Sequence, residues 1–180
     1  MTSPAGTRAE VRTAIVAFFE GKIGVTGTIP ALAQIYGFPE KIMAESDMYQ
    51  DFNPGMEEGA FMFVHLMNSR EQRIALGGPT NGQKWVEYEC MLTLVFRSAA
   101  QLSSDAGLAN ETMIDAIVAA VRSNREAGAA GTIFQWGEGT RTGGMDIEVT
   151  SFFPQQLHAS QGATQILTTI KVKVAQVINT

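Results

Sequence analysis

The clearest pattern in the sequence is an alternation of apolar and other residues through positions 83–98. Successive side chains of a β-strand point to opposite faces, so the alternation predicts one long strand with one buried face. The predicted core face carries Val86, Tyr88, Cys90, Leu92, Leu94 and Phe96. The other face carries Trp85, Glu87, Glu89, Met91, Thr93, Val95 and Arg97.

A strand of about fifteen residues measures roughly 50 Å, whereas a compact chain of this length is only about 40 Å across. The strand must therefore curve strongly or extend beyond the globule.

Two segments have helical periodicity instead. The first runs from about Arg8 to Phe19, has apolar residues on one side, and is ended by Gly21 and Gly24. The second lies in residues 110–128, where Asn110 is a suitable N-cap and Gly128 a suitable stop. Its apolar stripe consists of Met113, Ile114, Ile117, Val118 and Val121.

Further strands are predicted on both sides of the long one. Residues 60–68 are strand-like, a bend is expected near Asn68 and Ser69, and residues 70–76 continue as a second strand. The turn "GGPTNG" then joins this strand to the long one, and strand patterns return in residues 131–139, 144–153 and 163–178. The fold class is therefore α+β: one domain over residues 1–180, with a mainly antiparallel β-sheet, two helices packed on one face and a long extended β-hairpin.

Residues 25–58 contain β-type pieces interrupted by prolines and glycines, and we interpret them as a long, partly ordered loop that is most irregular at about 38–59. This loop has little apolar surface to bury, so we expect it to become ordered against a partner. The candidate partner-binding residues are Asp47, Asp51, Phe52, Glu57 and Glu58. Their spacing is not that of a calcium loop.

Composition narrows the class of protein. The chain of 180 residues is 45% hydrophobic and 17% charged, as expected of one globular domain. A net charge of −5 argues against a basic surface that binds nucleic acid. No apolar run approaches the roughly 20 residues of a membrane-spanning helix, and the N-terminus lacks the pattern of a signal peptide, so synthesis in the cytoplasm is expected. Cys90 is the one cysteine and is expected to be a buried thiol.

Candidate chemistry is sparse. His65 and His158 have no other ligand-type residues at metal-site spacing, and the glycine-rich "GEGTRTGG" lies between strand patterns, where a turn is the better interpretation. Glu87 and Glu89 share a strand face and could in principle form an acid/base pair, but a solvated or subunit-facing strand edge is the favoured interpretation, because nothing around them suggests a pocket. We therefore predict no catalytic, cofactor-binding or metal-binding residues and no cofactor.

The order of segments resembles the tail terminator, or tail completion, proteins of long-tailed bacteriophages, particularly those of actinobacterial hosts. The similarity lies in the helix "VRTAIVAFF", a proline-bearing stretch, the hairpin "REQRIALGGPTNGQKWVEYECMLTLVFRS", the helix ending "IVAAVRSNREAG", and "FQWGEG" before the last strands. The hairpin is the most specific part. The resemblance covers Ala60 to Thr180 together with the first helix.

The resemblance implies a virion protein without enzymatic activity. It implies a homo-oligomeric ring, commonly hexameric, at the head-proximal end of the tail tube, where it stops tube growth and offers the surface on which the head docks. The implied partners are the tail tube protein and the head-tail connector or neck proteins. DNA would only pass through the lumen, and no membrane is involved.

A strand that extends beyond its globule with Trp85, Met91 and Val95 on its outer face needs a neighbour to cover it, so we interpret the hairpin as the self-association element. The candidate residues are Arg73, Pro79, Thr80, Asn81, Lys84, Trp85, Glu87 and Glu89. Trp85 is either an anchor in the next copy or a local clamp that reaches back to Ile74 or Leu76.

Two alternatives remain open. One is another structural part of the same particle, either a tail-tube protein or a head-side neck protein. A tube protein should polymerise beyond one ring. The other is a small-molecule-binding or enzymatic α+β domain, in which Glu87, Glu89 and His65 would surround a cavity.

Overall fold

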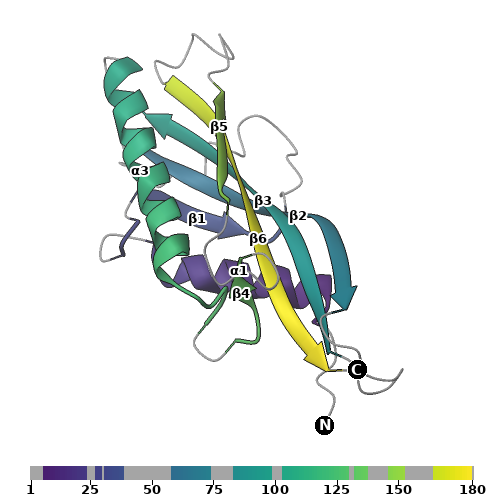
Figure 1. Cartoon of the computed structure of the whole chain (residues 1–180). Coiled ribbons are helices and arrows are strands. Elements are labelled where there is room, and N and C mark those ends of the chain that lie inside the picture. Colours follow the sequence, from purple (N-terminus) through teal and green to yellow (C-terminus); the bar gives the residue numbers. More distant parts are fainter. Residues whose placement is uncertain are drawn as a thin grey trace.

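The computed structural model describes residues 6–23, 27–29, 31–38, 58–73, 83–98, 103–129, 132–137, 146–152 and 164–179. In chain order the elements are α1 (Arg8–Glu20), β1 (Leu32–Tyr36), β2 (Glu58–Arg73), β3 (Gln83–Ser98), α3 (Ser103–Ser123), β4 (Gln135–Trp136), β5 (Glu148–Phe152) and β6 (Thr164–Asn179). The predicted α+β class with a mostly antiparallel sheet is confirmed (Figure 1).

Three strands of 16 residues each, β2, β3 and β6, form the centre of the sheet and pair antiparallel in the order β2-β3-β6. They curve together as they cross the molecule (Figure 1). The short β1 adds to β2 in parallel, and β4 and β5 both pair with β6 on its other side. The strand predicted over residues 83–98 therefore has its expected length.

The core lies against one set of alternating residues of the long strands. In β3 all six residues predicted to face the core are buried, with exposed fractions of at most 3%. The residues between them are half-buried or exposed, except Val95. One buried cluster joins the core residues of β3 to apolar side chains of both helices, namely Val11, Ile15, Phe18 and Phe19 from α1 and Met113, Ile114, Ile117 and Val121 from α3.

Helix α1 begins with a capping box. The Thr7 hydroxyl accepts a hydrogen bond from the Glu10 backbone N–H, and the Glu10 carboxylate accepts one from the Thr7 backbone N–H at 2.6 Å. These two bonds satisfy donors that a helix start otherwise leaves free. The helix is capped by Gly21, whose N–H donates to the Phe19 carbonyl, so the predicted limits are correct to within one residue.

The limits predicted for the second helix are wrong. Helix α3 starts at Ser103, seven positions before the expected cap at Asn110. Serine, aspartate and glycine in residues 103–107 are typical of turns, but Ala106 is fully buried within the hydrophobic cluster, and this burial supports the first part of the helix. At the other end, the Asn124 side chain donates to the Ala120 carbonyl at 2.7 Å. That carbonyl would otherwise bond the next helical N–H, which explains why α3 ends before Gly128.

Three expectations for the first half of the chain are also corrected. Strand β1 lies within the stretch interpreted as a loop, where Pro30 and small residues obscured a five-residue strand. Glu58 and Gly59 belong to β2 and pair with Ser98 and Arg97, so the irregular loop does not extend to residue 59. Residues 60–76 were expected as two strands, whereas β2 is continuous to Arg73 with a register shift between Leu66 and Ser69, at the predicted bend.

Candidate functional site

The candidate self-association residues that can be located lie where β2 ends and β3 begins. In this part of the ladder Arg70 pairs with Glu87, Gln72 with Trp85 and Arg73 with Lys84. On β2, residues 67–72 are all exposed. The structure therefore brings together Arg73, Lys84, Trp85, Glu87 and Glu89 along one end of the β2–β3 pair.

Lys84 and Trp85 differ in how they are engaged. The Lys84 ammonium lies 3.3 Å from the Glu71 carboxylate across the strand pair, and both side chains are partly exposed, so this ion pair adds little stability. Trp85 is half-buried and lies between Gln72 of β2 and Val177 of β6 in the register. Its indole N–H is buried and has no acceptor among the described residues.

The edge of β2 that faces away from β3 has different neighbours along its length. Strand β1 covers this edge as far as Phe63. The Arg8 guanidinium then donates to the backbone carbonyl of Leu66 at 2.6 Å and to that of Met67 at 3.4 Å. Within the described part of the chain, no strand lies beside the rest of β2 on that side. Unpaired edges of this kind can add a strand from another chain.

The N-terminal residue of the described chain is fixed beside the same end of the sheet. The Gly6 backbone N–H donates to the Gln176 side chain at 2.7 Å, and the Tyr88 hydroxyl donates to the Gly6 carbonyl at 2.6 Å. A Cβ atom at position 6 would collide with the Phe134 ring, so a glycine is required for this close approach. Burial raises the pKa of Tyr88, which keeps its hydroxyl protonated as the donor.

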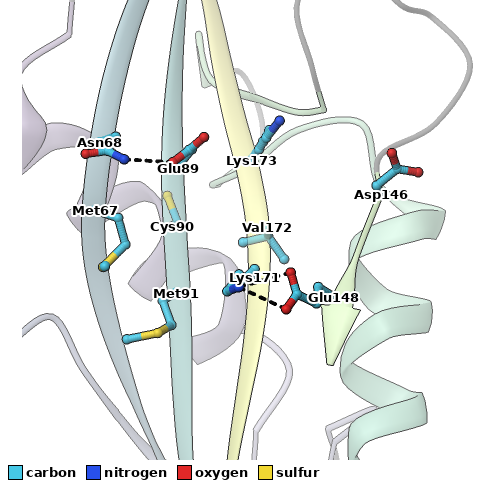
Figure 2. Close-up of a pocket in the computed structure, with 10 residues that line it drawn as sticks. All are labelled: Met67, Asn68, Glu89, Cys90, Met91, Asp146, Glu148, Lys171, Val172 and Lys173. Atoms are coloured by element: carbon cyan, nitrogen blue, oxygen red, sulfur yellow. Dashed lines mark hydrogen bonds and ion pairs between the residues drawn. The ribbon is translucent and has the colours of Figure 1, made fainter. Parts of the chain in front are cut away.

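A groove of about 460 Å³ crosses the sheet face that the core does not use, from β2 over β3 and β6 to β5 (Figure 2). Its apolar lining includes Met67 and Met91. On one side the Asn68 amide donates to the Glu89 carboxylate at 3.0 Å, and on the other the Lys171 ammonium lies 2.9 Å from the Glu148 carboxylate. Three of the charged side chains that line the groove, Glu89, Lys171 and Glu148, therefore already have partners.

This groove is not the cavity that the enzymatic alternative requires. Glu89 lines it, but Glu87 and His65 do not. Among the described residues no group of three or more histidines, cysteines and carboxylates could hold a metal ion. Cys90 is buried, and burial raises the pKa of its thiol to about 12, which disfavours the reactive thiolate.

Several predicted site residues lie outside the described part of the chain. These are Pro79, Thr80 and Asn81 of the turn, and Asp47, Asp51, Phe52 and Glu57 of the loop. Glu58 was assigned to that loop, but it is the first residue of β2. No helix in the described residues is long and apolar enough to cross a membrane.

Sequence reasoning missed the other exposed edge of the sheet. All five residues of β5 are exposed, including Val149 and Phe152. The pattern in residues 144–153 predicted a strand, but alternation alone does not show whether a strand lies at an edge or in the middle of a sheet. No protein-family model matches the chain, and no curated protein matches it either.

Proposed function

We propose that this chain is a structural virion protein that forms a ring at the head-proximal end of a phage tail tube. There it ends tube growth and provides the surface on which the head is joined. The sequence resemblance supports the identity, and one structural observation supports the self-association. That observation is the exposed end of β2, where residues 67–72 are solvent-accessible and have no neighbouring strand on one side among the described residues.

The proposal includes a specific architecture for the subunit. Both helices cover one face of the sheet, and the β2–β3 hairpin extends as an arm toward the next copy. The shared buried cluster supports the first point, because it contains helix residues and the alternating core residues of β3. Exposure of residues 67–72 supports the second. The uncovered face and edge are then the surfaces that a neighbouring copy occupies.

The ring has a defined set of partners in this proposal. One rim binds the tail tube protein, and the other binds head-tail connector or neck proteins. DNA passes through the lumen without being bound, and a net charge of −5 is compatible with weak affinity for the phosphate backbone. The protein is made in the host cytoplasm, becomes part of the virion, and has no catalytic activity.

One experiment separates this function from its alternatives. The purified chain is imaged by negative-stain electron microscopy and its mass is followed by sedimentation velocity from about 1 to 100 μM, a range in which ordinary protein interfaces associate. Closed rings of one size are expected. Long filaments would favour a tube protein instead, and a monomer at every concentration would contradict the ring.

A variant tests the role of the hairpin within that ring. Deletion of Pro79–Asn81 shortens the turn and should leave the core folded, because the core residues of β3 begin only at Val86. Ring formation and the joining of heads to tails should both fall. The matched control is Leu108→Ala, which removes an exposed apolar side chain of α3. If the shortened hairpin still forms rings at the parent concentration, the hairpin is not the assembly arm.

A further inference from the structure

Among the described residues, the sheet has two edges with no strand beside them, and they lie on opposite sides. On one side, no described strand lies beside β2 after the carbonyls that Arg8 binds, at Leu66 and Met67. On the other side, β5 pairs with β6 through residues 167–171, and no described strand lies beyond it. Figure 1 shows β5 beside β6, away from β2. A subunit with two different open edges can join copies of itself head to tail.

Exposed apolar side chains mark both edges. Met67 on β2 is 55% exposed, and on β5 Val149 is 41% and Phe152 61% exposed. In the register Val149 pairs with the buried Ile170 and Phe152 with Leu167, so the two β5 side chains lie on opposite faces of the sheet. Edge strands that stay solvent-exposed usually carry charges or prolines that prevent pairing. In β5 the one charged residue is Glu148 at its start, and the strand exposes apolar residues on both faces. A second strand placed beside β5 would cover both.

The strand directions permit this contact. Because β2, β3, β6 and β5 pair antiparallel one after another, β5 runs opposite to β2. A second copy placed beside the first in the same orientation therefore brings its β2 antiparallel to β5 of the first. The junction repeats the hydrogen-bond pattern that the sheet already uses.

The position along the strand is limited by β1. Traced across β6 and β3, the pairing places β5 at the same height in the sheet as Phe61–His65 of its own β2. At that height, however, the outer edge of β2 is already paired with β1 as far as Phe63. A neighbour must therefore shift by about six residues, roughly 20 Å, to reach the uncovered segment 67–72. A constant shift between copies tilts the strands relative to the ring axis, as in a closed barrel.

We propose that β5 of one copy pairs antiparallel with residues 67–72 of β2 in the next copy, with Thr150 opposite Arg70. This inference specifies the contact within the ring proposed above and depends on it. In this register Phe152 packs against Met67 and Asn68 of the neighbour, which covers the exposed apolar side chains of both edges. Arg70 lies opposite Glu87 in its own sheet without an ion pair between them in the described structure. The neighbour's Glu148 lies diagonally across from Arg70, within reach of its long side chain.

Cysteine cross-linking tests the register directly. In the variant Arg70→Cys/Thr150→Cys, both new thiols are on exposed residues, while Cys90 is buried with a pKa of about 12 and should not interfere. Under mild oxidation we expect a ladder of covalent oligomers on a non-reducing gel, ending at the number of copies in the ring. Each single variant should give no species above a dimer.

The matched control is Arg70→Cys/Ser151→Cys. Ser151 is the next residue of β5, and its hydroxyl lies 3.0 Å from that of the buried Thr168, on the other face of the sheet. This control should give only a small amount of covalent oligomer on the non-reducing gel. Two results would overturn the proposed register without contradicting the ring. One is a ladder of equal strength from both cysteine pairs. The other is no ladder from either pair while the wild type still forms rings. A ladder from Gln34→Cys/Thr150→Cys would show instead that β5 joins β1 without a shift.

A second variant does not require new covalent bonds. Phe152→Ala removes an exposed side chain and should leave the unfolding of the monomer unchanged, but it should raise the concentration for half-maximal ring formation at least tenfold. Leu108→Ala on α3, where the leucine is 65% exposed, should have no such effect. Equal ring formation by Phe152→Ala and wild type would contradict the contact. A wild type that never forms oligomers would contradict the ring itself.

Discussion

At the scale of single residues, alternation along β3 was enough to identify the core face. All six predicted residues are buried, because a strand that packs on one side must place every second side chain there. Asn110 was misassigned for a related reason. Asparagine at the start of an apolar pattern is typical of a cap, but this one is buried inside α3, where its amide nitrogen lies 3.5 Å from the Thr168 hydroxyl. The local sequence around Asn110 gives no sign of this contact, because Thr168 lies 58 positions further along the chain.

The core assignment leads to a stability prediction. Leu92 is fully buried in the centre of β3, so Leu92→Ala should lower the free energy of unfolding by about 2 to 5 kcal/mol, the usual range for a truncated core leucine. Thr93→Ala, at the next and half-buried position, is the control and should cost much less. Chemical denaturation at a fixed protein concentration measures both. An unchanged midpoint for Leu92→Ala would contradict the core position.

Cys90 gives a second prediction at this scale. Its thiol is buried, and burial raises its pKa to about 12, so almost no thiolate exists near neutral pH. At pH 8 the folded protein should react with a thiol reagent at least a hundred times more slowly than the protein unfolded in urea. Rapid reaction of the folded protein would mean that the β3 strand opens or that the thiol faces solvent.

At the scale of elements, long periodic segments were predictable and short or interrupted ones were not. Helix α1 was found almost to the residue, because its apolar spacing and its glycine stop agree. Strand β1 has only five residues and follows Pro30, which leaves too little pattern to distinguish it from a loop. The sequence predicts the irregularity in β2 at the correct position, between Leu66 and Ser69, but it predicts two strands there instead of one continuous strand. A bulge and a turn both interrupt the alternation of side chains, so the pattern does not distinguish them.

The capping box of α1 predicts a pH effect. Hydrogen bonds from the Thr7 backbone N–H and then from its hydroxyl lower the pKa of Glu10 below the ordinary 4.5. A lowered pKa in the folded state means that the charged carboxylate stabilises the fold above pH 4.5 and that this contribution is lost as the pH falls through the folded value. Glu10→Gln should therefore flatten the dependence of stability on pH below 4.5. Glu111→Gln, an exposed α3 variant, is the control. Identical profiles for Glu10→Gln and wild type would show that the capping bond does not form in solution.

At the scale of the whole molecule, the strand order, and the edges that have no neighbouring strand among the described residues, are seen only in three dimensions. The sequence predicted a long hairpin, but it could not show that β1 covers only part of β2 or that β5 lies at the opposite edge. Both depend on pairings between segments far apart in the chain. The surfaces available to a second copy are thus a property of the topology, whereas the core follows from local alternation.

Linkage between folding and assembly gives the final prediction, which also decides the role of Trp85. If the folded chain forms rings, mass action stabilises it, and its thermal midpoint should rise with protein concentration. If Trp85 is an anchor in the next copy, Trp85→Ala should weaken ring formation about thirtyfold, equivalent to about 2 kcal/mol, and should reduce this rise while leaving the midpoint at low concentration unchanged. If Trp85 is instead a clamp within one hairpin, the variant should lower the midpoint equally at all concentrations.

Trp85→Phe keeps the apolar ring but removes the buried indole N–H, which has no acceptor among the described residues. Only an acceptor supplied by the neighbour would make this milder variant weaken the ring without destabilising the monomer. Calorimetry of the wild type and both variants over a hundredfold range of concentration separates these outcomes, and a wild-type midpoint that does not depend on concentration would contradict the assembly itself.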